Sequence, residues 1–95
     1  MSSAEQHLRT WEAEQAIHAR HLVQAEAAYF AFSSTVPHEC GARSCSAGCP
    51  LAPTTKERAL LATLDDAVRS ARAGAEHAAE RVAHWRERTL RERAA

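Results

Sequence analysis

The sequence lacks the features that mark several specialised protein classes. Its 95 residues include a single lysine, Lys56, one tyrosine, two phenylalanines and two tryptophans. Its first twenty residues contain no apolar run, so we expect neither a signal peptide nor a transmembrane anchor, and the cytoplasm is the expected compartment. Arginine greatly outnumbers lysine and alanine is abundant, a composition that is typical of GC-rich bacterial genomes.

An excess of charge of one sign is also lacking, because 12 basic residues balance 12 acidic ones. A neutral chain exerts no long-range attraction on nucleic acid or on an anionic membrane, so neither is an expected partner. The sequence contains no phosphate-binding loop, no dinucleotide fingerprint and no nucleophile with a base on rigid elements. We therefore expect no enzymatic activity.

Residues 3–35 have the pattern of a long amphipathic helix. Ser2 and Glu5 have the spacing of an N-terminal capping box, and Pro37 is expected to end the helix. Between them, residues recur at alternating intervals of four and three, which is the heptad row of a coiled coil. The row consists of Leu8, Trp11, Gln15, His18, Leu22, Ala25, Tyr29, Phe32 and Val36.

Residues 55–92 repeat this pattern after Pro53, with Thr54 and Glu57 as a second capping box. Small residues in the middle of the second row allow the two helices to approach closely. We expect the charged end, residues 86–93, to fray. The second row consists of Leu61, Leu64, Val68, Ala71, Ala75, Ala78, Val82, Trp85 and Thr89.

Two helices of similar length joined by one connection predict an all-α fold, a single-domain antiparallel two-helix hairpin that resembles a coiled coil. Ala16, Val23 and Phe30 form a second apolar strip on the first helix, outside the heptad row. We expect this strip to pair two hairpins as a homodimer, most simply a C2 four-helix bundle. The alternative is a monomer in which the strip is exposed.

The connection, residues 37–53, contains all three cysteines and all three prolines of the chain. Three thiols cannot pair completely into disulfides within one chain, and thiols in a reducing cytosol stay free or bind metal. Tetrahedral zinc requires four thiolate or imidazole ligands, which the loop can supply. We therefore predict a Zn²⁺ site formed by His38, Cys40, Cys45 and Cys49.

Other interpretations of this loop stay open. An iron–sulfur cluster is the first alternative, because clusters also bind thiolates and Cys49 precedes Pro50 as in ferredoxin-type motifs. Copper(I) also prefers soft thiolate ligands. A disulfide between Cys45 and Cys49, or thiols without any role, are the remaining interpretations.

The other histidines are weaker candidates. Glu14, His18 and His21 have spacings at which helical side chains can meet, which permits a second metal site, although no Glu-x-x-His motif is present. We expect His7, His77 and His84 to form a solvated surface near the open end of the hairpin. The two tryptophans occupy heptad positions of the core.

The segment from Arg81 to Arg93 is rich in arginine and could contact phosphates. The alternation of arginine with glutamate in this segment favours a surface of ion pairs instead. The sequence as a whole thus predicts a zinc-binding helical module for assembly or protein interaction. The alternative function is a metal-responsive or redox-responsive regulator with a labile loop, which could contact nucleic acid through its C-terminal helix.

Overall fold

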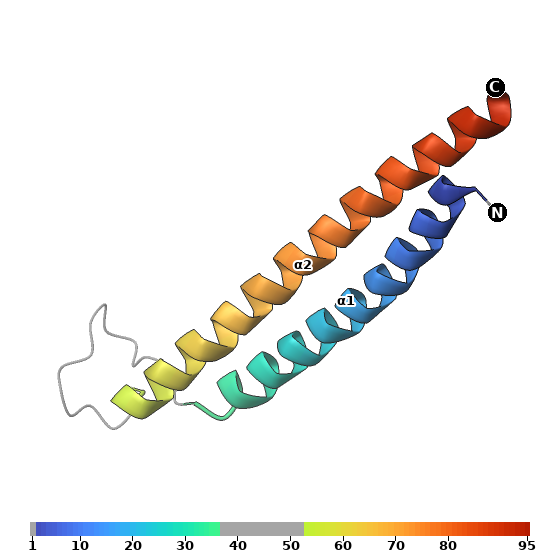
Figure 1. Ribbon diagram of the computed structural model, residues 1–95. Helices are drawn as coiled ribbons and strands as arrows, with labels where there is room; N and C mark the ends of the chain where they lie inside the picture. Colours follow the sequence, from blue (N-terminus) through green and yellow to red (C-terminus); the bar gives the residue numbers. More distant parts are fainter. Residues whose placement is uncertain (1, 37–52) are drawn as a thin grey trace.

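The computed structural model describes residues 2–36 and 53–95, and within these ranges two helices are the regular secondary structure. Helix α1 comprises Ser3–Ser33 and helix α2 comprises Thr55–Ala94. The two helices lie side by side and run antiparallel, so that both termini lie at one end, the open end (Figure 1). The expected antiparallel two-helix hairpin is confirmed.

Side-chain caps fix the first turn of each helix. The Thr54 hydroxyl accepts a hydrogen bond from the Glu57 amide at 3.1 Å, and Glu57 Oε1 accepts one from the Thr54 amide at 2.8 Å, which completes the predicted capping box. At α1 only half of the box forms. Ser2 Oγ accepts from the Glu5 amide at 3.2 Å, but the Glu5 carboxylate lies toward Arg93, 3.7 Å away.

The helices end at other residues than the sequence pattern predicts. Helix α1 ends at Ser33, four residues before Pro37, where three consecutive hydroxyls bond back to carbonyl oxygens of the last turn. Such local hydrogen bonds compete with helix continuation. Helix α2 continues to Ala94 through the segment expected to fray, and Arg86, Arg91 and Arg93 form ion pairs there.

The heptad rows form the contact between the helices. The buried residues of the described chain are Ala4, Val36, Val68, Ala78, Val82 and Thr89. The large side chains of the rows, such as Trp11, Tyr29, Phe32 and Trp85, remain half-buried. A single pair of helices is too thin to enclose them, so the core of one hairpin is incomplete.

The hairpin is a narrow rod of 69 × 21 × 15 Å. Neither of the two described helices has a segment that is long and apolar enough to cross a membrane.

Candidate functional site

The predicted zinc ligands His38, Cys40, Cys45 and Cys49 lie outside the residues that the structure describes. The zinc prediction for this loop therefore still rests on the sequence pattern. Within residues 2–36 and 53–95, no three histidine, cysteine or acidic side chains are placed to hold a metal ion.

The second candidate metal site, at Glu14, His18 and His21, is not assembled for coordination. His18 Nε2 lies 3.8 Å from Glu14 Oε2, and the imidazole rings of His18 and His21 are 6.2 Å apart between centroids. His18 packs instead against the α2 backbone, where a Cβ at Gly74 would lie 2.8 Å from His18 Nδ1. Because Gly74 has no side chain, α2 leaves room for the His18 imidazole in the heptad row.

An open groove lies beside this contact, on the flank of the hairpin that carries His18 and His21. Its volume is about 690 Å³. The lining combines two imidazoles, an amide and a hydroxyl with small apolar side chains. The residues are His18, His21, Gln24, Ala25, Ala67, Ser70, Ala71 and Gly74.

A group of aromatic and basic side chains in mutual contact surrounds Trp85 at the open end. His7 of α1 stacks on the Trp85 ring, with centroids 4.3 Å apart and planes inclined by 16°. His84 meets the same ring edge-on at 5.0 Å, and His77 meets Trp11 edge-on at 5.5 Å. The three histidines predicted to form a solvated surface are exposed, but each contacts a tryptophan.

Two arginines complete this group. Arg81 Cζ lies 5.7 Å from the centroid of Trp11 and 5.8 Å from that of Trp85, between the two helices. Arg88 Cζ lies 5.7 Å from the centroid of Trp85. These distances are within the range of cation–π attraction, which holds a guanidinium against an aromatic ring without neutralising its charge. We call His7, Trp11, His77, Arg81, His84, Trp85 and Arg88 the tryptophan cluster.

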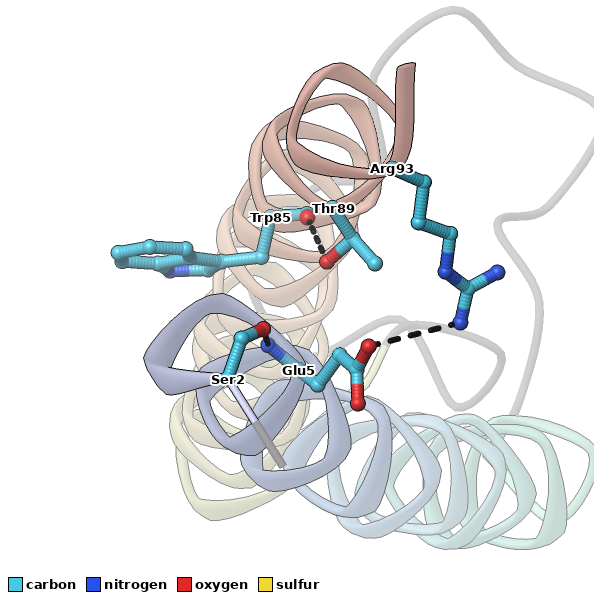
Figure 2. Close-up of polar contacts among 5 residues, drawn as sticks. All are labelled: Ser2, Glu5, Trp85, Thr89 and Arg93. Atoms are coloured by element: carbon cyan, nitrogen blue, oxygen red, sulfur yellow. Dashed lines mark hydrogen bonds and ion pairs between the residues drawn. The ribbon is translucent and has the colours of Figure 1, made fainter. Parts of the chain in front are cut away.

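One polar atom of the cluster is unusual. Trp85 Nε1 is buried and has no hydrogen-bond partner, the one such side-chain atom within the described ranges. On the backbone side of Trp85, Thr89 is 4% exposed, and its hydroxyl donates to the Trp85 carbonyl at 2.8 Å (Figure 2). Burying an N–H group without a hydrogen-bond partner costs stability. Ring contacts, rather than a hydrogen bond, therefore hold the indole of Trp85 in its position.

The opposite flank of the open end carries ion pairs. Arg86 lies 3.7 Å from Glu12, and Arg93 lies 3.7 Å from Glu5, so both pairs join α1 to α2. Figure 2 shows Trp85 pointing to one side of the hairpin and the pair of Arg93 and Glu5 to the other. One flank of the rod therefore carries the tryptophan cluster, and the other carries the ion pairs between the helices.

The structure also places the second apolar strip of α1. Val23 is 67% exposed and Phe30 is 66% exposed, and neighbouring Ala16 is exposed as well. Between them, a shallow apolar hollow of about 300 Å³ is lined by Ala19, Arg20, Val23 and Gln24. Phe30 also lines a pocket of about 230 Å³ with Val68 and Arg69 of α2, so α2 lies beside this end of the strip but leaves most of Phe30 exposed.

The tryptophan cluster was only partly accessible to sequence analysis. The heptad placed both tryptophans in the core, and Arg81 and Arg88 lie four residues before and three after Trp85, positions from which a helical side chain can reach that ring. The spacing alone did not distinguish this contact from ion pairs with the neighbouring glutamates.

No family model, curated protein or solved structure shows significant similarity to this chain.

Proposed function

We propose that the protein is a non-catalytic assembly module, a helical hairpin that associates with a second copy of itself and binds zinc in its connecting loop. The observation that supports it is the strip of Ala16, Val23 and Phe30, which remains exposed although the strip follows the periodicity of a helix contact. A large exposed apolar strip on a small protein is typical of an interaction surface.

The incomplete core supports the same proposal. No large side chain within the described residues is fully buried, because each helix has a single neighbour. A second hairpin placed against α1 would cover Val23 and Phe30 and convert two helices into four, an arrangement that encloses a core. Burying one such side chain contributes about 1.5–3 kcal/mol.

A second copy is the partner that fits the charge of the chain. The formal net charge is zero, so two copies approach without net repulsion. The strip is bordered by charges of both signs, Arg20 and Glu26, which allows a surface to face itself without a like-charge conflict. The simplest closed arrangement of identical surfaces is a C2 dimer.

The zinc part of the proposal belongs to His38, Cys40, Cys45 and Cys49 at the closed end. A metal there would link the two helices beyond their contact, which stabilises a domain of this size. Thiolate ligands persist in a reducing compartment, so we place the protein in the cytoplasm.

The mass in solution tests the assembly proposal. Light scattering during size-exclusion chromatography should give twice the 10.4 kDa of one chain. The double variant Val23→Gln/Phe30→Gln should elute as a monomer with the helical circular dichroism of the wild type, because both side chains are largely exposed in the hairpin. The matched control is Leu90→Gln, which changes a 59% exposed side chain away from the strip and should remain dimeric. A monomeric wild type at 100 µM would contradict the proposal.

A further inference from the structure

The two flanks of the hairpin differ in how their arginines are neutralised. On the flank of Glu5 and Glu12, Arg93 and Arg86 each face a carboxylate of the other helix. On the opposite flank, Arg81 and Arg88 face the rings of Trp11 and Trp85 instead. The charge of these two guanidiniums is therefore not compensated by an ion pair within the described part of the chain.

These arginines belong to a continuous cationic row along α2. Residues at alternating intervals of four and three lie on one side of a helix, and from position 77 onward this row contains no carboxylate. The row is about 21 Å long at about 1.5 Å per residue. It consists of His77, Arg81, His84, Arg88 and Arg91.

The histidines extend the row across to α1. His7 stacks on Trp85 between the helices, and His18 and His21 border the groove farther along the same flank. All five histidines of the described chain thus lie on the flank opposite the interhelix ion pairs. Glu14 lies 3.8 Å from His18 on this flank.

The tryptophans prepare the two arginines for a phosphate ligand. A guanidinium held near a ring by cation–π attraction does not use its N–H donors in an ion pair there, so they remain available to a ligand. Those donors fit the oxygens of a phosphate bidentately. The ring also reduces the rotational freedom of the side chain, which lowers the entropy lost on binding. By contrast, Arg91 NH2 is held by Glu87 Oε1 at 2.6 Å.

We propose that this cationic row binds the phosphate backbone of a nucleic acid strand, with Arg81 and Arg88 as the principal contacts. Arg81 and Arg88 are two helical turns apart, about 10 Å along the axis, a separation that suits a ligand with repeated phosphates rather than a single anion. Histidine and arginine side chains already contact the rings of Trp11 and Trp85, so we assign the contact to the arginines rather than to base stacking. Binding is therefore independent of sequence and acts through charge.

The neutral net charge of the chain limits the strength of this binding. Two uncompensated arginines displace about two counterions, which gives a slope of roughly −1.5 for the logarithm of affinity against the logarithm of salt concentration. The interaction is accordingly expected at low ionic strength and at high local concentration of the protein. The strip of Val23 and Phe30 is separate from the row, so this inference does not depend on the proposed assembly.

Fluorescence anisotropy with a labelled 20-nucleotide single strand of mixed sequence tests the inference at 20 mM salt. The variant Arg81→Gln/Arg88→Gln should bind at least tenfold more weakly than the wild type. The control Arg86→Gln/Arg93→Gln removes the same charge from the other flank and should change the affinity less than threefold. Equal losses in the two variants, or no binding by the wild type, would overturn the proposal.

Two further measurements separate charge from folding and from assembly. Arg81→Lys/Arg88→Lys keeps both charges but lacks the planar guanidinium, so it should bind more weakly than the wild type and more tightly than Arg81→Gln/Arg88→Gln; binding no tighter than that of the Gln variant would contradict a phosphate contact made by charge. Val23→Gln/Phe30→Gln alters the assembly strip and should retain binding per chain within threefold; loss of binding there would place the contact elsewhere. Inorganic polyphosphate as a competitor should displace the strand, and failure to compete would exclude a backbone contact.

Discussion

His18 of α1 lies directly against Gly74 of α2, so closely that a methyl group at Gly74 would be 2.8 Å from Nδ1 and 3.1 Å from Cε1 of the imidazole. A heptad position is thus occupied by a polar ring because the facing helix has no side chain there. The contact fixes the register of the two helices at the middle of the rod, where the facing residues are small.

This contact predicts opposite effects of one substitution in two backgrounds. Gly74→Ala in the wild type should lower the free energy of unfolding by about 1 kcal/mol, because the ring must move and this cost exceeds the helix propensity gained. In a His18→Ala background the same change should raise stability by about 1 kcal/mol, since only the propensity remains. Thermal melts followed by circular dichroism measure both. An equal effect in the two backgrounds would show that the ring is not confined by Gly74.

The capping box of α2 predicts that substitutions of two threonines, Thr54 and Thr63, differ in their effect on stability. Thr54→Ala removes the hydroxyl that accepts from the Glu57 amide and should cost about 1 kcal/mol. Thr63→Ala is the matched control, because the Thr63 hydroxyl only donates to the Ala59 carbonyl within the helix. That substitution should be neutral or slightly stabilising, since alanine is the better helix former. If urea melts gave the two variants the same stability, the cap would not contribute.

Heptad spacing predicted the pairing of the helices correctly, because burial of side chains at intervals of four and three is a property of the sequence itself. Val68, Ala78, Val82 and Thr89, the buried residues of α2, all belong to the predicted row. The pattern did not predict the half-formed cap at Ser2. The position of the Glu5 carboxylate depends on Arg93, 88 residues away in the chain, and no local rule includes that contact.

The contacts of the tryptophan cluster were less predictable from the sequence than the pairing of the helices, because they depend on packing between α1 and α2. A heptad position specifies the side of the helix on which Arg81 or Arg88 lies, but not which of two neighbours its side chain contacts. Tryptophan rings and glutamates are both within reach of these arginines along α2, and the choice between them depends on packing across the helix pair. The alternation of signs from residue 86 onward correctly predicted ion pairs for Arg86, Arg91 and Arg93.

The buried Nε1 of Trp85 leads to a third prediction. Trp85→Phe removes an N–H that has no partner, which offsets part of the ring area lost, so the free energy of unfolding should fall by less than about 1 kcal/mol. Trp85→Ala removes the ring contacts with His7 and both arginines and should cost about 3 kcal/mol. Trp11→Phe is the control. A larger loss for Trp85→Phe than for Trp11→Phe in chemical melts would indicate that the indole N–H is hydrogen-bonded in solution.

The loop of residues 37–53 supports a fourth prediction, which concerns metal content. Protein purified without added metal should contain about one zinc per chain by elemental analysis, because one imidazole and three thiolates complete a tetrahedral shell. Cys45→Ser should lower the zinc content and the melting temperature together, whereas Ser46→Ala, the adjacent control, should change neither.

The response to chelation decides between the two functions considered for the loop. A structural zinc resists mild chelators, and its removal by strong ones lowers the melting temperature, since the free energy of metal binding is part of the free energy of folding. A labile sensor site would exchange metal or oxidise while the helical circular dichroism stayed unchanged. Iron in place of zinc, visible as a brown colour, would favour a cluster on the same cysteines. A protein that contains no metal and melts at the same temperature with and without added zinc would exclude both forms of the site, and the exposed strip on α1 would then be the remaining basis for an assembly role.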